Sequence, residues 1–238
     1  MGNADVVGDL HRLIAFDLDG TLVDSRRDLA ESANELIVEL GGAPLSEETI
    51  AGMVGEGAAL LVQRALTSAG VEDLRGALQR FLQIYDTRLL RHTRIYPGMA
   101  DVVRYARTVG RVAVLTNKPL APSERILDGL GIRDLFDVVI GGDGPLPRKP
   151  DPAALRALMR ETDATPDTTL LVGDSAIDHE TAVRAQVRCC LVSFGFGYRT
   201  FRGERLRNED RVAADAGELR ELIAGFYLPR LNGNSYEK

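Results

Sequence analysis

Five short apolar runs recur along the chain, and stretches with helical periodicity separate them. Apolar runs without alternation are typical of strands that are buried on both faces. When such strands alternate with helices, the expected architecture is an α/β fold in which helices cover both faces of a parallel sheet. The runs lie at residues 13–16, 112–115, 138–140, 170–172 and 189–192.

The connection between the first two predicted strands is too long for a single crossover helix. It spans about seventy residues, where a dozen or so suffice to join parallel strands. Its pattern is helical nearly throughout, so we predict a helical insertion at residues 25–95 within a sheet domain formed by residues 1–24 and 96–238. The expected helices cover residues 29–40, 46–54, 58–69 and 72–90.

Composition narrows the possible environment and partners of the protein. Of its 238 residues 45% are hydrophobic, and the formal net charge of -6 argues against non-specific nucleic-acid binding. No apolar stretch is long enough to cross a bilayer, and residues 1–9 lack the apolar centre of a secretory signal. We therefore expect a cytoplasmic protein without a membrane partner, in which the adjacent Cys189 and Cys190 are reduced and buried in a strand.

Polar side chains follow directly on the ends of three predicted strands. Ligands of an open parallel sheet bind beyond the carboxyl ends of its strands, so these side chains are expected to converge. Lys149, in the loop after the run at 138–140, can reach the same place. The residues at the strand ends are Asp17 and Asp19, then Thr116, Asn117 and Lys118, and finally Asp174, Ser175 and Asp178.

These residue types suit the hydrolysis of a phosphate monoester. A carboxylate such as Asp17 can act as nucleophile and split a slow reaction into two easier steps. Asp17 and Asp174 suit the oxygen shell of Mg²⁺, which offsets the repulsion between nucleophile and phosphate. Lys149 adds a positive charge, and Thr116 offers a hydroxyl donor to a phosphoryl oxygen. Asp19 can protonate the leaving oxygen and later deprotonate the attacking water.

Taken singly, these residues also fit structural roles. An aspartate after a strand is often a turn residue or a helix cap, and a lone loop lysine is usually solvated. Asp17 and Asp19 differ, because two carboxylates closing an apolar strand repel each other unless a cation compensates. We expect the carboxyl groups of Asp17, Asp19 and Asp174 to surround one divalent cation, with Lys149 alongside.

The four elements together resemble the signature of the haloacid dehalogenase superfamily. Asp17-Leu18-Asp19-Gly20-Thr21 is similar to its first motif, Thr116 to the second, Lys149 to the third, and Gly173-Asp174-Ser175 with Asp178 to the fourth. The resemblance implies a Rossmann-like core with a helical cap inserted after the first motif. It also implies Mg²⁺ as cofactor and several residue roles. These roles are Asp17 as nucleophile, Asp19 as general acid and base, Asp174 and the Asp19 carbonyl as metal ligands, Ser175 and Asp178 as residues that orient the metal ligands, and Thr116, Asn117 and Lys149 as phosphate-binding residues.

Within the superfamily the chain is most similar to bacterial phosphoglycolate phosphatases. The likeness rests on Val54-Gly55-Glu56-Gly57, Tyr96-Pro97-Gly98, Thr116-Asn117-Lys118-Pro119 and Val139-Ile140-Gly141-Gly142-Asp143. The stretch Gln186-Val187-Arg188-Cys189-Cys190 departs from the family, which usually has an Ala-Gly pair there. Phosphoglycolate is thus the first expected substrate, and another small phosphorylated metabolite, such as a sugar phosphate or a biosynthetic intermediate, is the alternative.

Other activities of the superfamily fit the sequence less well. Dehalogenases lack the second aspartate, which is present here as Asp19. Phosphohexomutases carry a histidine where this chain has Leu29, and a cationic residue in the loop that here reads Gly55-Glu56-Gly57-Ala58. A binding protein without turnover would be expected to lose the nucleophile, the acid or the metal ligand.

Substrate specificity is expected to arise in the cap. The Gly55-Glu56-Gly57 turn opens a helix, so its amides could meet a carboxylate or hydroxyl, although an ordinary turn between helices fits the glycines equally well. Lys118, Arg64 and Arg199 are candidates to bind an anionic leaving group. His179 is expected to face solvent. The sequence leaves a monomer and a homodimer open.

Overall fold

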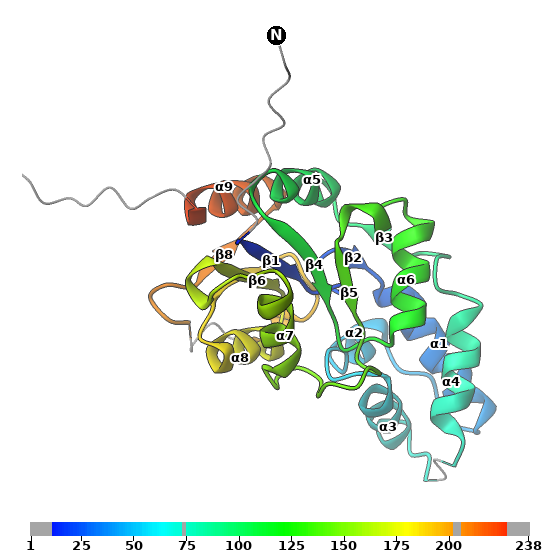
Figure 1. The fold of residues 1–238 in the computed structure, drawn as a ribbon. Coiled ribbons are helices and arrows are strands. Elements are labelled where there is room, and N and C mark those ends of the chain that lie inside the picture. The colour runs from blue at the N-terminus through cyan, green and yellow to red at the C-terminus, as the bar shows by residue number, and fades with distance from the viewer. Residues whose placement is uncertain (1–10, 73–74, 202–205, 228–238) are drawn as a thin grey trace, which may run out of the picture.

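The computed structural model describes residues 11–72, 75–201 and 206–227; the terminal parts of the predicted sheet domain lie outside this range. Its centre is a six-stranded parallel sheet of order β5-β4-β1-β6-β7-β8 (Figure 1). All five predicted strands are present, and each matches its apolar run to within one residue at either end. The strands are β1 (Leu13–Phe16), β4 (Arg111–Leu115), β5 (Val138–Ile140), β6 (Thr169–Gly173), β7 (Arg188–Val192) and β8 (Arg211–Ala213), of which β8 was not predicted.

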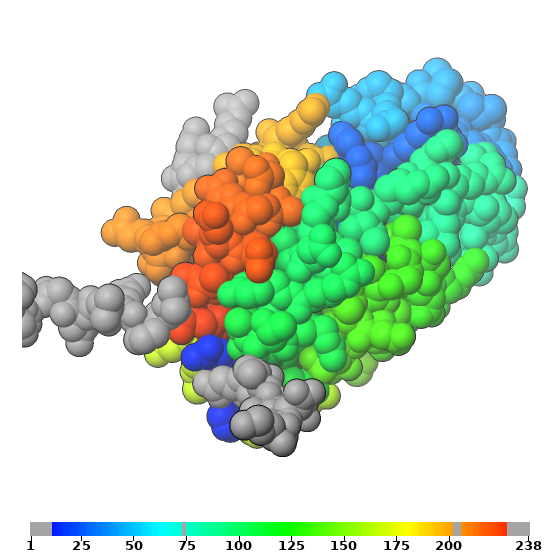
Figure 2. Space-filling model, turned by 90° about the horizontal axis from the view of Figure 1, so that it is seen from above, coloured from blue at the N-terminus to red at the C-terminus, as the bar shows by residue number. Residues whose placement is uncertain are grey.

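Helices cover both faces of this sheet, which confirms the predicted α/β, Rossmann-like architecture. In β1 the side chains alternate between the faces: Ile14 and Phe16 join the cluster under α5 and α9, and Leu13 and Ala15 join the cluster under α7 and α8. Figure 2 shows α9 lying beside α5. The helices are α5 (Met99–Val109), α6 (Leu120–Gly129), α7 (Ala153–Glu161), α8 (Ala176–Ala185) and α9 (Ala216–Tyr227), with short 3₁₀ turns at Arg133–Leu135, Pro166–Thr168 and Tyr198–Thr200.

The long connection after β1 is a group of four helices. The insert is attached to the sheet domain through a two-residue antiparallel ladder. In this ladder β2 (Val23–Asp24) enters the insert and β3 (Arg94–Ile95) leaves it. α1 packs against α2 and α4, and α3 packs against α4, so the helices share one apolar core. Figure 2 shows the insert gathered at one end of the molecule. The helices are α1 (Arg26–Glu39), α2 (Glu47–Ala51), α3 (Ala58–Ser68) and α4 (Ala77–Asp86).

The fourth helix is shorter than the pattern at 72–90 predicts. It begins after Gly76, whose φ of 69° lies in the left-handed region that glycine adopts without strain. Beyond Asp86 the backbone bonds tighten to three-residue spacing, as in the bond from the Arg88 N–H to the Tyr85 carbonyl.

A buried carboxylate joins the beginning and the end of the insert. Asp28, in the first turn of α1, has no exposed surface and accepts hydrogen bonds from the backbone N–H groups of His92 and Thr93 and from the Thr93 hydroxyl, at 2.7–3.1 Å. These charge-assisted bonds fix the returning chain just before β3. No helix in the described ranges is both long enough and apolar enough to cross a membrane.

Candidate active site

The sheet itself places the polar residues that follow its strands. The Asp17 N–H donates to the Val172 carbonyl at 2.9 Å, which extends the pairing of β1 with β6 by one residue. The Thr116 N–H likewise donates to the Ile140 carbonyl at 3.0 Å, which extends the pairing of β4 with β5. Asp17, Thr116 and Asp174 therefore meet at the carboxyl edge of the sheet, as predicted.

Three carboxylates gather at this edge. Asp17, Asp174 and Asp178 each offer an oxygen within 4.8 Å of the others, and all three side chains are buried. Asp178 is held by Ser175, the N-cap of α8, whose hydroxyl donates to Asp178 Oδ2 at 2.6 Å and whose N–H donates to the same oxygen at 3.1 Å. The Asp178 N–H donates back to the Ser175 hydroxyl at 3.5 Å, and this reciprocal cap explains why a Ser-x-x-Asp sequence follows β6.

Lys149 supplies the positive charge within this cluster. Its ammonium donates to Asp17 Oδ1 at 2.8 Å and to Asp178 Oδ1 at 2.6 Å. The lysine is only 5% exposed, so solvent screens these contacts little. The loop after β5 thus brings Lys149 to the predicted place.

Burial and mutual repulsion shift the pKa values of the carboxyl groups upward. Burial raises the pKa of Asp17 to about 6, with Lys149 opposing the shift and the charges of Asp178 and Asp19 adding to it. Burial, together with the charges of Asp178 and Asp17, holds the pKa of Asp174 well above its usual range. Burial alone lowers the pKa of Lys149, but the two carboxylates outweigh it and raise that pKa above its ordinary value. One ammonium therefore leaves the negative charge of the cluster only partly compensated.

The residues present fit a divalent cation such as Mg²⁺. Carboxylate oxygens are the hard ligands that Mg²⁺ prefers, and an uncompensated cluster of them favours a cation. The backbone is shaped to keep Asp174 at the site: Gly20 has a φ of 88°, and a Cβ placed there would lie 2.0 Å from Asp174 Oδ2. The Gly197 N–H donates to that same oxygen at 2.8 Å.

The side chain of Asp19 takes a different position from the one expected. Instead of joining the three carboxylates, it accepts a hydrogen bond from the Ser25 hydroxyl at 2.6 Å and two contacts from the Lys118 ammonium, at 3.0 and 3.1 Å. Asp178 takes its place in the cluster. Asp17 and Asp19 diverge because the chain turns after Leu18, whose carbonyl accepts hydrogen bonds from the N–H groups of Leu22 and Val23.

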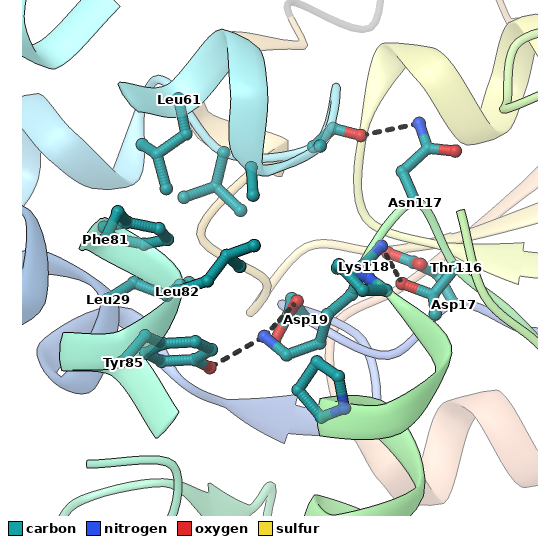
Figure 3. A pocket seen from close by; sticks show the side chains of 16 residues that line it. Asp17, Asp19, Leu29, Leu61, Phe81, Leu82, Tyr85, Thr116, Asn117 and Lys118 are labelled. Atoms are coloured by element: carbon teal, nitrogen blue, oxygen red, sulfur yellow. Dashed lines mark hydrogen bonds and ion pairs between the residues drawn. The ribbon is translucent and has the colours of Figure 1, made fainter. Parts of the chain in front are cut away.

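Lys118 connects Asp19 to the insert. Its ammonium donates to the hydroxyl of Tyr85, on α4, at 2.7 Å (Figure 3). The Lys118 side chain is only 5% exposed. Burial alone lowers the pKa of Lys118, but Asp19 and Tyr85 outweigh that effect and raise it, so the group stays cationic. Burial raises the pKa of Tyr85 to about 12.

A pocket opens beside Asp17 and Asp19, between the insert and the loop after β4 (Figure 3). Its polar lining consists of the two aspartates with Thr116, Asn117 and Lys118, and Gly55 and Gly57 contribute backbone. Tyr85 presents its hydroxyl and ring, and the other lining side chains are apolar. They are Leu29, Val54, Ala58, Leu61, Phe81, Leu82, Pro119 and Pro122.

The side-chain amide of Asn117 joins the insert to the loop that carries Lys149. Its Nδ2 donates to the carbonyl of Gly55 in the insert at 2.8 Å and to the carbonyl of Lys149 at 2.9 Å. Both N–H groups of this side chain are thus engaged with backbone carbonyls, and the expected contact of Asn117 with phosphate stays a prediction. The Thr116 hydroxyl accepts a hydrogen bond from the Lys118 N–H at 3.2 Å and keeps its own proton for another acceptor.

Several residues that the sequence offered as weaker candidates lie outside the pocket. Glu56 and Arg64 pair with each other at 2.5 Å on the surface, and Arg199 pairs with Glu48 at 3.2 Å. His179 is buried rather than solvent-facing, because Asp210 pairs with its ring at 3.0 Å. The two cysteines are free thiols buried in β7, as predicted.

Sequence reasoning missed the contribution of α4. Phe81 and Tyr85 are one helical turn apart, stack at 5.8 Å between ring centroids and both line the pocket. Their i, i+4 spacing within the apolar face of this helix was the available signal, but it indicates only a buried face and not which pocket that face meets.

Comparison with known proteins places this site in a family. The model of the haloacid dehalogenase-like hydrolases matches residues 14–192. A phosphoglycolate phosphatase from Pseudomonas putida is 40% identical over 199 residues, covering 80% of this chain and 72% of the relative. One from Cereibacter sphaeroides is 39% identical over 191 residues, covering 77% and 85%. A solved structure from Haemophilus somnus, described as a predicted phosphoglycolate phosphatase, has a TM-score of 0.80 at 28% identity and covers 90% of this chain and 98% of its own. The chain belongs to the haloacid dehalogenase-like hydrolase family.

Proposed function

We propose that this hydrolase is a phosphatase that acts on a small phosphomonoester, with 2-phosphoglycolate as the first candidate substrate. The observation that carries the proposal is the buried cluster of Asp17, Asp174 and Asp178, in which Lys149 pairs with Asp17 and Asp178 and Asp17 also lines a pocket that can hold a leaving group. The names of the relatives support both the phosphatase activity and the substrate.

In the proposed first step, a carboxylate oxygen of Asp17 attacks phosphorus, and the bond from phosphorus to the ester oxygen breaks. Lys149 holds Asp17 Oδ1, which leaves Oδ2 without a hydrogen bond to any other described residue and free to attack. Asp19 gives its proton to the departing oxygen. Thr116 and Lys149 donate to the phosphoryl oxygens, where negative charge develops.

In the second step, Asp19 takes a proton from water as the water attacks phosphorus, the bond to Asp17 breaks, and phosphate leaves. Asp17, Asp174 and the Asp19 carbonyl are the proposed ligands of Mg²⁺, and Ser175 and Asp178 orient them. When bound, the ion neutralises charge between the carboxylates and the phosphate.

The insert has a proposed role of its own. Residues 25–95 act as a cap domain over a core domain formed by residues 1–24 and 96–238. The bond from Asn117 to the Gly55 carbonyl and the bond from Lys118 to Tyr85 hold the two parts together, and closure of such a cap keeps water from the reacting groups. We place the enzyme in the cytoplasm, as a monomer or homodimer.

A second candidate function is the hydrolysis of another phosphorylated metabolite, such as a sugar phosphate or a biosynthetic intermediate. The apolar character of the pocket wall favours an intermediate with apolar carbon over a sugar. A phosphohexomutase fits less well, because Leu29 lines the pocket and provides no proton-transferring group. A binding protein without turnover is disfavoured, because the three carboxylates and Lys149 are assembled.

Turnover of phosphorylated metabolites tests the proposed function. Purified enzyme with Mg²⁺ is expected to release inorganic phosphate from a panel of such metabolites, with the highest kcat/KM for 2-phosphoglycolate, and a chelator should abolish the reaction. Activity that survives prolonged chelation would remove the metal from the proposal. A panel led by a different compound would favour the second candidate.

Replacing Asp19 with asparagine tests the acid role. Asp19→Asn is expected to slow hydrolysis of alkyl phosphates by about 100-fold or more, since an alkoxide needs a proton to leave. A nitrophenyl ester, whose leaving group is stable as an anion, should lose much less in the first step. Single-turnover kinetics with both esters separate this step from the second. Equal losses of phosphorylation rate for the two esters would contradict the role.

A further inference from the structure

We propose that Lys118 and Tyr85 form a subsite for a carboxylate that lies one carbon from the ester oxygen of the substrate. The inference rests on the proposed function, because it takes Asp19 as the group that meets the ester oxygen. It narrows the substrate class to phosphate esters of 2-hydroxycarboxylic acids. It assigns recognition of the carboxylate to Lys118, in the loop after β4, and to Tyr85, on α4 of the insert.

Positive charge is confined to one place in the pocket. Among the described residues that line it, Lys118 is the sole cation, and the wall beyond it is formed by apolar side chains such as Leu61, Phe81 and Leu82. A carboxylate buried against that wall would lack a partner, and an unpaired buried charge is strongly unfavourable. The negative charge of an anionic leaving group can therefore be paired only with Lys118 among the described lining residues.

Lys118 and Asp19 are close enough to contact neighbouring groups of one small substrate. The Lys118 ammonium lies 3.0 Å from the nearer oxygen of Asp19. In a 2-phosphonooxy acid a single carbon separates the ester oxygen from the carboxyl carbon. An ester oxygen in hydrogen-bond contact with Asp19 thus brings the carboxylate within reach of the same ammonium.

Lys118 and Tyr85 can both supply hydrogen-bond donors to a carboxylate. Lys118 directs two contacts at one carboxylate, so the N–H at 3.1 Å from Asp19 Oδ1 can turn to the substrate while the contact to Oδ2 remains. Tyr85 accepts from Lys118, and its own hydroxyl proton has no acceptor among the described residues. Because the pKa of Tyr85 is raised, this proton stays in place and can be donated to the second carboxylate oxygen.

Matched substrates test the subsite in the unaltered enzyme. Ethyl phosphate has a methyl group where 2-phosphoglycolate has its carboxylate. In 3-phosphonooxypropionate the carboxylate lies one carbon further from the ester oxygen. We expect kcat/KM for 2-phosphoglycolate to exceed the values for both by about 100-fold or more, as for sites built around a polar group of the substrate. Comparable values for ethyl phosphate and 2-phosphoglycolate would overturn the subsite and leave the phosphatase intact. Failure to hydrolyse any phosphomonoester would instead overturn the proposed function.

Two variants then locate the subsite. Lys118→Met keeps the length of the side chain and removes its charge, and it is expected to reduce the preference for 2-phosphoglycolate over ethyl phosphate to within about 10-fold. Tyr85→Phe removes one neutral donor and should lower that preference by about 5- to 20-fold. Arg64→Met, which removes a surface cation of the cap, is the control and should leave the preference unchanged.

The ratio of the two substrates distinguishes recognition from a structural role. If Lys118→Met lowers kcat/KM equally for both substrates, Lys118 acts through Asp19 and the subsite is wrong. If that variant does not fold, the Tyr85→Phe ratio decides, and an unchanged ratio there overturns the contribution of the cap.

Discussion

Replacing Asp17 with asparagine is expected to lower kcat by at least about 10⁴-fold, as for other enzymes that lose their nucleophile. An amide cannot form the covalent intermediate, although it occupies nearly the same volume. The variant should keep its fold. Without metal its unfolding temperature should be equal to or above that of the unaltered protein, because burial and neighbouring carboxylates make the charged form of Asp17 unfavourable. Turnover of an aryl phosphate and thermal unfolding with a chelator measure the two effects.

A surface aspartate provides the control for this experiment. Asp101 is exposed on α5 and pairs with Arg104 alone among the described residues, so Asp101→Asn should change neither quantity appreciably. The absence of a phosphorylated enzyme in Asp17→Asn, after rapid quench with substrate, would complete the result. Residual turnover above about one thousandth of the original rate would contradict the role of Asp17 as nucleophile.

Replacing Lys149 with methionine is expected to affect both catalysis and stability. Loss of the ammonium removes the charge opposite the phosphoryl group, so kcat should fall by at least about 10³-fold. It also leaves Asp17 and Asp178 buried without their partner, which costs about 3–5 kcal/mol when one member of a buried ion pair is removed. Urea unfolding with a chelator, and again with Mg²⁺, should show part of that loss restored by the ion.

The adjacent Arg148 offers a matched control. It carries the same charge in the same loop but is exposed, and its guanidinium donates to the Gly142 carbonyl. Arg148→Met should therefore change the free energy of unfolding by about 1 kcal/mol or less. Equal destabilisation by both variants would mean that the loop, and not the carboxylate cluster, accounts for the loss.

The fold could be predicted where local pattern and tertiary burial coincide. The run at 170–172 has no alternation because β6 is buried on both faces. Strand β8 was missed because Arg-Val-Ala is too short and too polar to form such a run at a sheet edge. The β2–β3 ladder was missed for a similar reason, since two residues per strand cannot establish a period.

The residues of the site also fall into those that could be placed from the sequence and those that could not. Asp17, Thr116 and Asp174 could be assigned because a parallel sheet brings its strand ends to one edge, whatever the side chains do. The pairing of Lys118 with Asp19 and Tyr85 could not, because it depends on how α4 packs over the loop after β4, with Tyr85 33 residues before Lys118. The bridge that the Asn117 amide makes to Gly55 and Lys149 could not be predicted either, because an asparagine suits both a ligand contact and a backbone bridge.

The narrow attachment of the helical insert has a consequence for how such enzymes diversify. Since the chain leaves through Val23–Asp24 and returns through the strand paired directly beside it, exchanging everything between them need not break a single hydrogen bond of the six-stranded sheet. Asp17 and Lys149 lie outside the exchanged segment and would keep their places, while a different insert would supply new side chains to the pocket wall. Chimeras joined at this ladder are thus a natural route to altered selectivity.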